Sequence, residues 1–100
     1  MPVVDDPEGV SAKILQEFLD FTDKRILEIG CGEGRITRDI ADRSSHITAI
    51  DPLEEDIQFA IENTPTHLKR KIDYQALAIA EFPLPEDSAK FDIALFTWSL

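Results

Sequence analysis

Apolar and polar positions follow two different periods along this chain. Short runs rich in Ile, Val, Leu and Phe predict four buried strands, at residues 25–30, 46–51, 72–79 and 91–100. Between them, apolar residues recur every three or four positions and predict helices at residues 34–43 and 53–62. An earlier stripe of the same spacing predicts a leading helix within residues 9–23, after an extended lead-in at residues 1–8.

The order of these elements predicts an α/β fold. Strands that alternate with helices form right-handed βαβ units, which build a mainly parallel, doubly wound, Rossmann-like sheet with helices on both faces. The last run, at residues 91–100, is almost continuously apolar, as in a strand buried on both faces. A complete sheet of this kind needs about 200 residues, at about 30 per βα unit. We therefore interpret residues 1–100 as the N-terminal part of one larger domain whose later strands are absent.

The composition is that of an ordinary globular domain, with 43% hydrophobic and 30% charged residues. A net charge of −10 and a pI of about 4.4 argue against nucleic-acid binding by this segment and against binding to anionic membranes. No apolar run reaches the ~20 residues of a membrane helix, and residues 1–6 lack the basic and apolar regions of a signal peptide. A single cysteine, Cys31, fits a reducing compartment, so the predicted location is the cytoplasm. Neither His46 nor His67 has the spacing of a metal ligand, and no metal is predicted.

Three of the four glycines fall within five residues, where the first predicted strand meets a helix. Gly30, Gly32 and Gly34 allow positive φ and let another molecule approach the backbone closely. A strand-to-helix turn of this kind directs backbone N–H groups and the positive helix end at a polar or anionic ligand. Asp51 ends the second strand 21 positions after Gly30, and an acid at that distance can accept both hydroxyls of a ribose.

The glycine spacing separates the candidate ligands. A dinucleotide-binding motif needs G-x-G-x-x-G, but Arg35 and Thr37 stand where its last glycine would fall, so an NAD-binding oxidoreductase is the weakest interpretation. What remains is G-x-G-x-G, with Glu28 two residues before the first glycine. With the sequence ILEIGCGEG at residues 26–34, together with Asp51, the chain closely resembles class I S-adenosylmethionine-dependent methyltransferases over about residues 24–100.

The resemblance implies a strand order of 3-2-1-4 and S-adenosyl-L-methionine as the cofactor. Glu28 would hold the ammonium of its methionine part, and Asp51 would bind its ribose hydroxyls. The glycine loop would pass under the methionine and ribose, and Pro52 or Leu53 would pack on the adenine. The full set of residues that the resemblance assigns to the cofactor is Glu28, Gly30, Cys31, Gly32, Gly34, Asp51, Pro52, Leu53, Ile79, Ala80, Glu81 and Thr97.

One stretch departs from the family pattern. Residues 78–81 align where the family often has Asp-Ala-Glu, and Ile79 replaces the Asp that meets the adenine amino group. Backbone groups at Ile79 and Ala80, or the side chain of Glu81, are the alternatives for adenine recognition. The end of the fourth strand, around Thr97, would lie near the transferable methyl group.

The resemblance predicts an enzyme that transfers a methyl group to an unidentified acceptor, either a small molecule or a protein. Catalysis would be largely alignment of that acceptor for in-line displacement. No catalytic residue is assigned, because acceptor-side residues usually come from later strands. The alternative is a non-catalytic S-adenosylmethionine-binding module or regulatory subunit. The same strand order would leave residues 93–98 as an open apolar edge, so self-association through residues 91–100 is expected.

Overall fold

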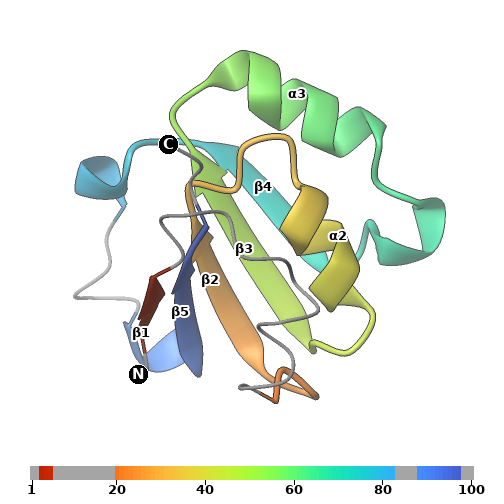
Figure 1. Cartoon of the computed structure of the whole chain (residues 1–100), viewed down its shortest axis with the longest axis vertical. Helices are drawn as coiled ribbons and strands as arrows, with labels where there is room; N and C mark the ends of the chain where they lie inside the picture. Colours follow the sequence, from red (N-terminus) through yellow and green to blue (C-terminus); the bar gives the residue numbers. More distant parts are fainter. Residues whose placement is uncertain (1–2, 6–19, 83–87, 98–100) are drawn as a thin grey trace.

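The computed structural model describes residues 3–5, 20–82 and 88–97 and contains a single parallel sheet (Figure 1). Its five strands lie in the order β1-β5-β2-β3-β4, and every neighbouring pair is parallel. The strands are β1 Val3–Asp5, β2 Arg25–Ile29, β3 His46–Asp51, β4 Ile72–Ala76 and β5 Ile93–Phe96. The four strands predicted from the sequence are all present, and their predicted order of 3-2-1-4 is confirmed.

Strand β2 ends one residue earlier than predicted, and two further strands are several residues shorter. Strand β4 ends at Ala76 instead of residue 79, because the Leu77 N–H turns back to the Gln75 carbonyl and the 3₁₀ turn η2, Ile79–Glu81, follows. Strand β5 covers four residues of the predicted run at 91–100, and residues 98–100 lie outside the described residues.

The first strand corrects one expectation. Val3, Val4 and Asp5 pair in parallel with Ala94, Leu95 and Phe96, so the lead-in supplies a strand and β5 is not an open edge over these residues. Consecutive β-branched residues favour this extended conformation, and the pairing satisfies backbone groups that would otherwise be unpaired. The expected self-association through residues 91–100 assumed an exposed strand, and over residues 94–96 that assumption is wrong.

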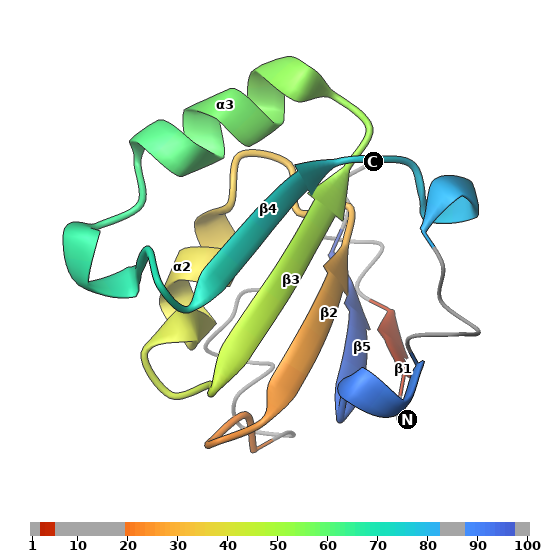
Figure 2. The same cartoon turned by 180° about the vertical axis from the view of Figure 1, so that it is seen from behind.

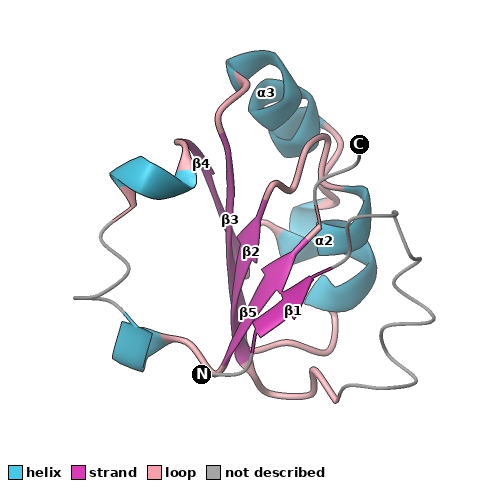
Figure 3. Ribbon diagram, turned by 60° about the vertical axis from the view of Figure 1, so that its left-hand side comes forward, coloured by secondary structure: helices cyan, strands magenta, loops and turns pink. Residues whose placement is uncertain are grey.

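Two helices pack against the same face of the sheet (Figures 1 and 3). They are α2, Arg35–Ala41, and α3, Glu54–Glu62, which confirm the predicted helices with slightly narrower bounds. Most of the predicted leading helix lies outside the described residues, and Asp20 to Asp23 form a turn in which the Asp20 carboxylate accepts the Thr22 N–H at 2.9 Å. No helix in the described part of the chain is long and apolar enough to cross a membrane.

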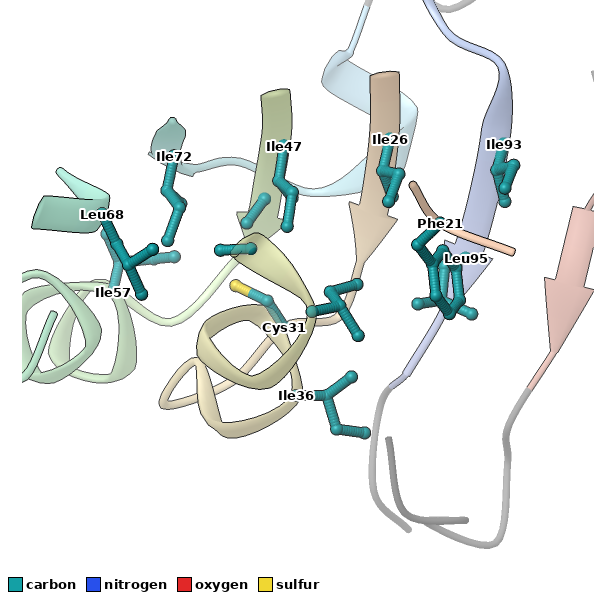
Figure 4. Packing of buried hydrophobic residues seen from close by; sticks show 13 residues of the cluster. Phe21, Ile26, Cys31, Ile36, Ile47, Ile57, Leu68, Ile72, Ile93 and Leu95 are labelled. Atoms are coloured by element: carbon teal, nitrogen blue, oxygen red, sulfur yellow. The ribbon is translucent and has the colours of Figure 1, made fainter. Parts of the chain in front are cut away.

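Alternate strand residues build the core on the helix side of the sheet. Ile72, Ile47, Ile26 and Ile93 form a row across four neighbouring strands in Figure 4, as their pairing requires. Buried residues of the two helices, such as Ile36 and Ile57, complete this cluster.

Intervening strand residues face the other side of the sheet. Leu27, Ile29 and Ile50 pack there with Phe82, and Phe91 and Phe96 lie against them. The rear view in Figure 2 shows the strands on this side uncovered by α2 or α3, although helices were predicted on both faces. In the described part of the chain, the residues outside the strands that pack on this face are Leu77, Phe82 and Phe91.

Candidate cofactor site

The glycine loop leaves β2 in a tight turn at the carboxyl edge of the sheet. The N–H groups of Gly30 and Cys31 both donate to the Ile50 carbonyl of β3, at 2.8 and 3.1 Å. All three glycines have positive φ, at 80° for Gly30, 56° for Gly32 and 82° for Gly34. Because L side chains rarely adopt this conformation, the local backbone explains the glycine spacing found in the sequence.

Gly32 and Gly34 nevertheless face different surroundings. A Cβ atom at Gly32 would meet no described atom within 4 Å beyond its chain neighbours, so open space lies beside this part of the loop. A Cβ atom at Gly34 would come within 2.9 Å of both the Ala60 Cβ and the Tyr74 hydroxyl. Gly34 therefore allows the loop to pack against α3 and β4, whereas Gly32 leaves room for a ligand.

Asp51 fixes the shape of the loop from the end of β3. One carboxylate oxygen accepts the Gly32 N–H at 3.0 Å, and the other accepts the Leu53 N–H at 2.9 Å. A carboxylate has about four lone-pair positions, so two remain for other donors, such as ribose hydroxyls. Asp51 thus links the glycine loop to the start of α3 and still has capacity to accept from a ligand.

Glu28 is a completely buried carboxylate on the helix side of β2. Its two oxygens accept hydrogen bonds from different elements, one from the Thr37 hydroxyl of α2 and the other from the Thr97 hydroxyl just after β5. Burial raises the pKa of Glu28, and the two hydroxyl donors act in the opposite direction because they stabilise the ionised form. Sequence reasoning did not assign Thr37 to the site. The sequence feature that could have indicated Thr37 is its position as a polar residue between Ile36 and Ile40, on the buried face of a predicted helix.

Cys31 lies in the loop with its side chain buried. Burial, together with the negative charges of Glu28 and Asp51, raises the pKa of its thiol well above the usual range. A thiol in these surroundings stays protonated and is a poor nucleophile. Cys31 therefore contributes its small size and its backbone to the loop.

Two adjoining clefts open at this edge of the sheet and differ in character. The first encloses about 330 Å³ and is the more polar of the two, lined by Glu28, Gly30, Cys31, Gly32, Glu33, Arg35, Ile36, Asp51, Leu53, Asp56 and Thr97. The second also encloses about 330 Å³ and is mainly apolar, lined by Ile29, Gly30, Ile50, Asp51, Pro52, Leu53, Leu77, Ala78 and Ile79. Gly30, Asp51 and Leu53 line both, so the two clefts meet beside the Asp51 carboxylate.

The structure brings most of the predicted site residues together, but not all of them. Gly34, Ala80 and Glu81 line neither cleft. The Glu81 carboxylate turns back to accept the Ala78 N–H at 3.1 Å, which caps η2. Ile79 does line the apolar cleft, and Leu53 and Ile79 are among the few large apolar side chains that are well exposed in the described residues.

A ligand with a cationic end, a ribose and a flat apolar base matches this arrangement. A buried carboxylate lies in the polar cleft, an aspartate lies at the junction, and exposed aliphatic side chains flank the second cleft. The open space beside Gly32 gives such a ligand access to the loop backbone. The residues present therefore fit S-adenosylmethionine.

Comparison with known proteins agrees with this geometry. A family model described as a methyltransferase domain matches residues 26–100, which cover β2 except Arg25, the glycine loop and the strands β3, β4 and β5. The chain therefore belongs to the class I S-adenosylmethionine-dependent methyltransferases, as the resemblance of residues 26–34 and Asp51 to that family predicted.

Individual relatives support the same family. The chain is 33% identical over 70 residues to a ubiquinone biosynthesis O-methyltransferase of Idiomarina loihiensis, a match that covers 70% of this chain and 28% of the relative. An S-adenosylmethionine-dependent methyltransferase of Mesorhizobium loti superposes with a TM-score of 0.70 at 27% identity, over 84% of this chain and 37% of that one. A Haemonchus contortus phosphoethanolamine N-methyltransferase, solved with phosphoethanolamine and S-adenosylhomocysteine, superposes with a TM-score of 0.63 at 28% identity. This match covers 71% of the present chain and 15% of the Haemonchus protein. The chain thus spans less than a third of the length of the curated relative.

Proposed function

We propose that the protein carrying these residues binds S-adenosylmethionine at the paired clefts and transfers its methyl group to an acceptor. The observation that carries this proposal is the meeting of a polar and an apolar cleft at Asp51. When bound, the cofactor supplies a methyl group already activated by its positively charged sulfur. The task of the protein is then to hold and align, which suits a site built from a rigid loop.

Each side chain has a role that follows from its chemistry. Glu28 provides a negative charge for the cofactor's ammonium, and Asp51 accepts hydrogen bonds from the ribose hydroxyls with its remaining lone pairs. Leu53 and Ile79 offer apolar surface to the adenine. Because the Glu81 carboxylate is engaged with the Ala78 N–H, backbone groups near Ile79 are the better candidates for adenine recognition.

The acceptor belongs to the same proposal. The curated relative is named for O-methylation, so a hydroxyl on a small molecule is the first acceptor class to test. We propose the cytoplasm as the compartment, because the sequence contains a single cysteine, as suits a reducing environment.

Calorimetry on the intact protein tests the binding step by comparing S-adenosylhomocysteine with NAD. We expect S-adenosylhomocysteine to bind more tightly, and tighter binding of NAD would overturn the assignment. A transfer assay with methyl-labelled cofactor and a panel of hydroxyl and amine acceptors tests the second step. Binding without transfer to any acceptor would favour the alternative of a non-catalytic cofactor-binding module.

A further inference from the structure

The carboxylate of Glu28 has no ionic partner among the described residues, although it is completely buried. Its oxygens accept from the hydroxyls of Thr37 and Thr97, and no described cationic side chain forms an ion pair with it. A buried carboxylate without a cation or several hydrogen-bond donors would take up a proton. Burial raises the pKa of Glu28, and the two hydroxyls are the described groups that oppose this by stabilising the ionised form.

The two donors also fix the direction of the carboxylate. Thr37 approaches from α2 and Thr97 from the end of β5, so rotation of the carboxylate would break at least one of the two hydrogen bonds. Thr97 is held in turn, since its N–H donates to the Ile29 carbonyl at 3.0 Å. Both Glu28 and Thr97 line the polar cleft, so the buried carboxylate lies directly behind the wall of that cleft.

We propose that Thr37 and Thr97 are positioning residues, whose hydroxyls hold the Glu28 carboxylate ready to bind the cofactor's ammonium. This inference rests on the cofactor binding proposed above. Neither threonine needs to touch the cofactor for this role. Loss of one hydroxyl should favour the protonated form of Glu28, which cannot pair with an ammonium. Cofactor affinity should then fall with decreasing pH sooner than in the wild-type protein.

Other ionisable groups surround the same cleft and could contribute to a pH profile. Those that line the cleft are Cys31, Glu33, Arg35, Asp51 and Asp56. Tyr74 of β4 lies outside the cleft but interacts electrostatically with Glu28 and with Arg38 of α2. Burial raises the pKa of both Cys31 and Tyr74, so neither titrates in acid. The Glu28→Gln variant identifies the contribution of Glu28 to the pH profile, because this substitution removes the titration of Glu28 and leaves the other acids in place.

The test is Thr37→Val in the intact protein, because valine keeps the shape of threonine and cannot donate. Affinity for S-adenosylhomocysteine, measured by calorimetry across a pH series, should be lost at a higher pH than in the wild type. Between the two midpoints the variant should bind about tenfold more weakly, as for loss of one hydrogen bond to a charged group. Thr37→Ser should restore the wild-type profile. Thr48→Val is the matched control, because Thr48 is a buried threonine on β3 outside the polar cleft.

A second measurement does not depend on the cofactor. The titration of the Glu28 carboxyl, followed by ¹³C NMR in the ligand-free protein, should also move to higher pH in Thr37→Val. A uniform loss of affinity at every pH, with an unmoved NMR titration, would overturn the inference by showing a merely structural role. A third outcome separates the two proposals. If the wild-type protein does not bind S-adenosylhomocysteine, but the Glu28 titration of Thr37→Val still lies at higher pH than that of the wild type, the proposed function is refuted and the effect of the hydroxyls on Glu28 is supported. If Thr37→Val does not fold, Thr97→Val removes the other donor and allows the same comparison.

Discussion

The substitutions Gly32→Ala and Gly34→Ala should have different effects, one on cofactor binding and the other on folding, although the two residues lie in one loop. At Gly34 the new methyl group would come within 2.9 Å of the Ala60 Cβ and the Tyr74 hydroxyl, closer than real Cβ contacts. At Gly32 it would enter open space. We therefore expect Gly34→Ala to impair folding and Gly32→Ala to impair cofactor binding.

The magnitudes follow from backbone and packing. Each alanine adopts a left-handed conformation, at φ 56° for Gly32 and φ 82° for Gly34, which costs about 1–2 kcal/mol. Overpacking at Gly34 adds about 1–3 kcal/mol. Gly34→Ala should thus lower the free energy of unfolding by about 2–5 kcal/mol, against about 1–2 kcal/mol for Gly32→Ala. A domain whose total stability is about 5–15 kcal/mol would tolerate the second change better than the first.

The assay pairs denaturant unfolding with calorimetry on both variants of the intact protein. The methyl group of Gly32→Ala occupies the approach to the loop, so affinity for S-adenosylhomocysteine should fall at least about tenfold, or 1.4 kcal/mol. The folded fraction of Gly34→Ala should bind more tightly than Gly32→Ala. The reasoning is refuted if Gly32→Ala is the less stable variant, or if both variants bind equally well.

Two substitutions and one labelling experiment test the site and the sheet further. Asp51→Ala should lower the free energy of unfolding by about 1.5–3 kcal/mol even without cofactor, because Asp51 accepts two backbone N–H groups; unchanged stability in a denaturant titration would contradict this. Hydrogen bonds from Arg25 lower the pKa of Asp92 to about 2, so this carboxylate stabilises the fold above about pH 4 and loses that effect between about pH 4 and 2. Acid unfolding of Asp92→Asn should therefore show a smaller loss of stability over that interval, and an identical pH profile would argue against the pair. Cys31 should react with a thiol-specific reagent at pH 8 only as fast as the protein opens, and rapid labelling of native protein would show that the thiol is accessible.

The central elements were predictable because their signals are local. A short apolar run followed by glycines at alternate positions can satisfy its backbone in few ways, so β2, the loop and α2 follow from neighbouring residues. Asp51 was equally predictable, since a β-branched run ends at it and Pro52 follows. These features depend on spacing along the chain, which a sequence displays directly.

Strand β1 was not predictable in the same way. Three residues are too few for a periodic pattern, and their strand partners lie at residues 94–96, at the far end of the chain. Their role in the sheet depends on that distant partner. The lead-in was recognised as extended, but nothing near Val3 and Val4 indicates that it would pair.

The hydrogen-bond partners of side chains could not be predicted from the sequence either. Thr37 was visible as a polar residue on a buried helical face, but its partner Glu28 lies on another element. The sequence makes Glu81 a candidate for adenine contact, but in the structure the turn η2 places its carboxylate against the Ala78 N–H. In both cases the competing partner appears only once the chain has folded.

The pairing of β1 with β5 bears on how the protein is made. On a ribosome, β2, β3 and β4 emerge early, and each can pair with a strand already synthesised or soon to follow. Strand β1 emerges before the other described strands, but its partner in the described sheet, at Ala94 to Phe96, is among the last described residues to appear. Closing so long a loop is slow compared with local pairing. We expect Val3 to Asp5 to remain accessible to proteases on nascent chains until β5 has left the exit tunnel, long after the glycine loop has formed.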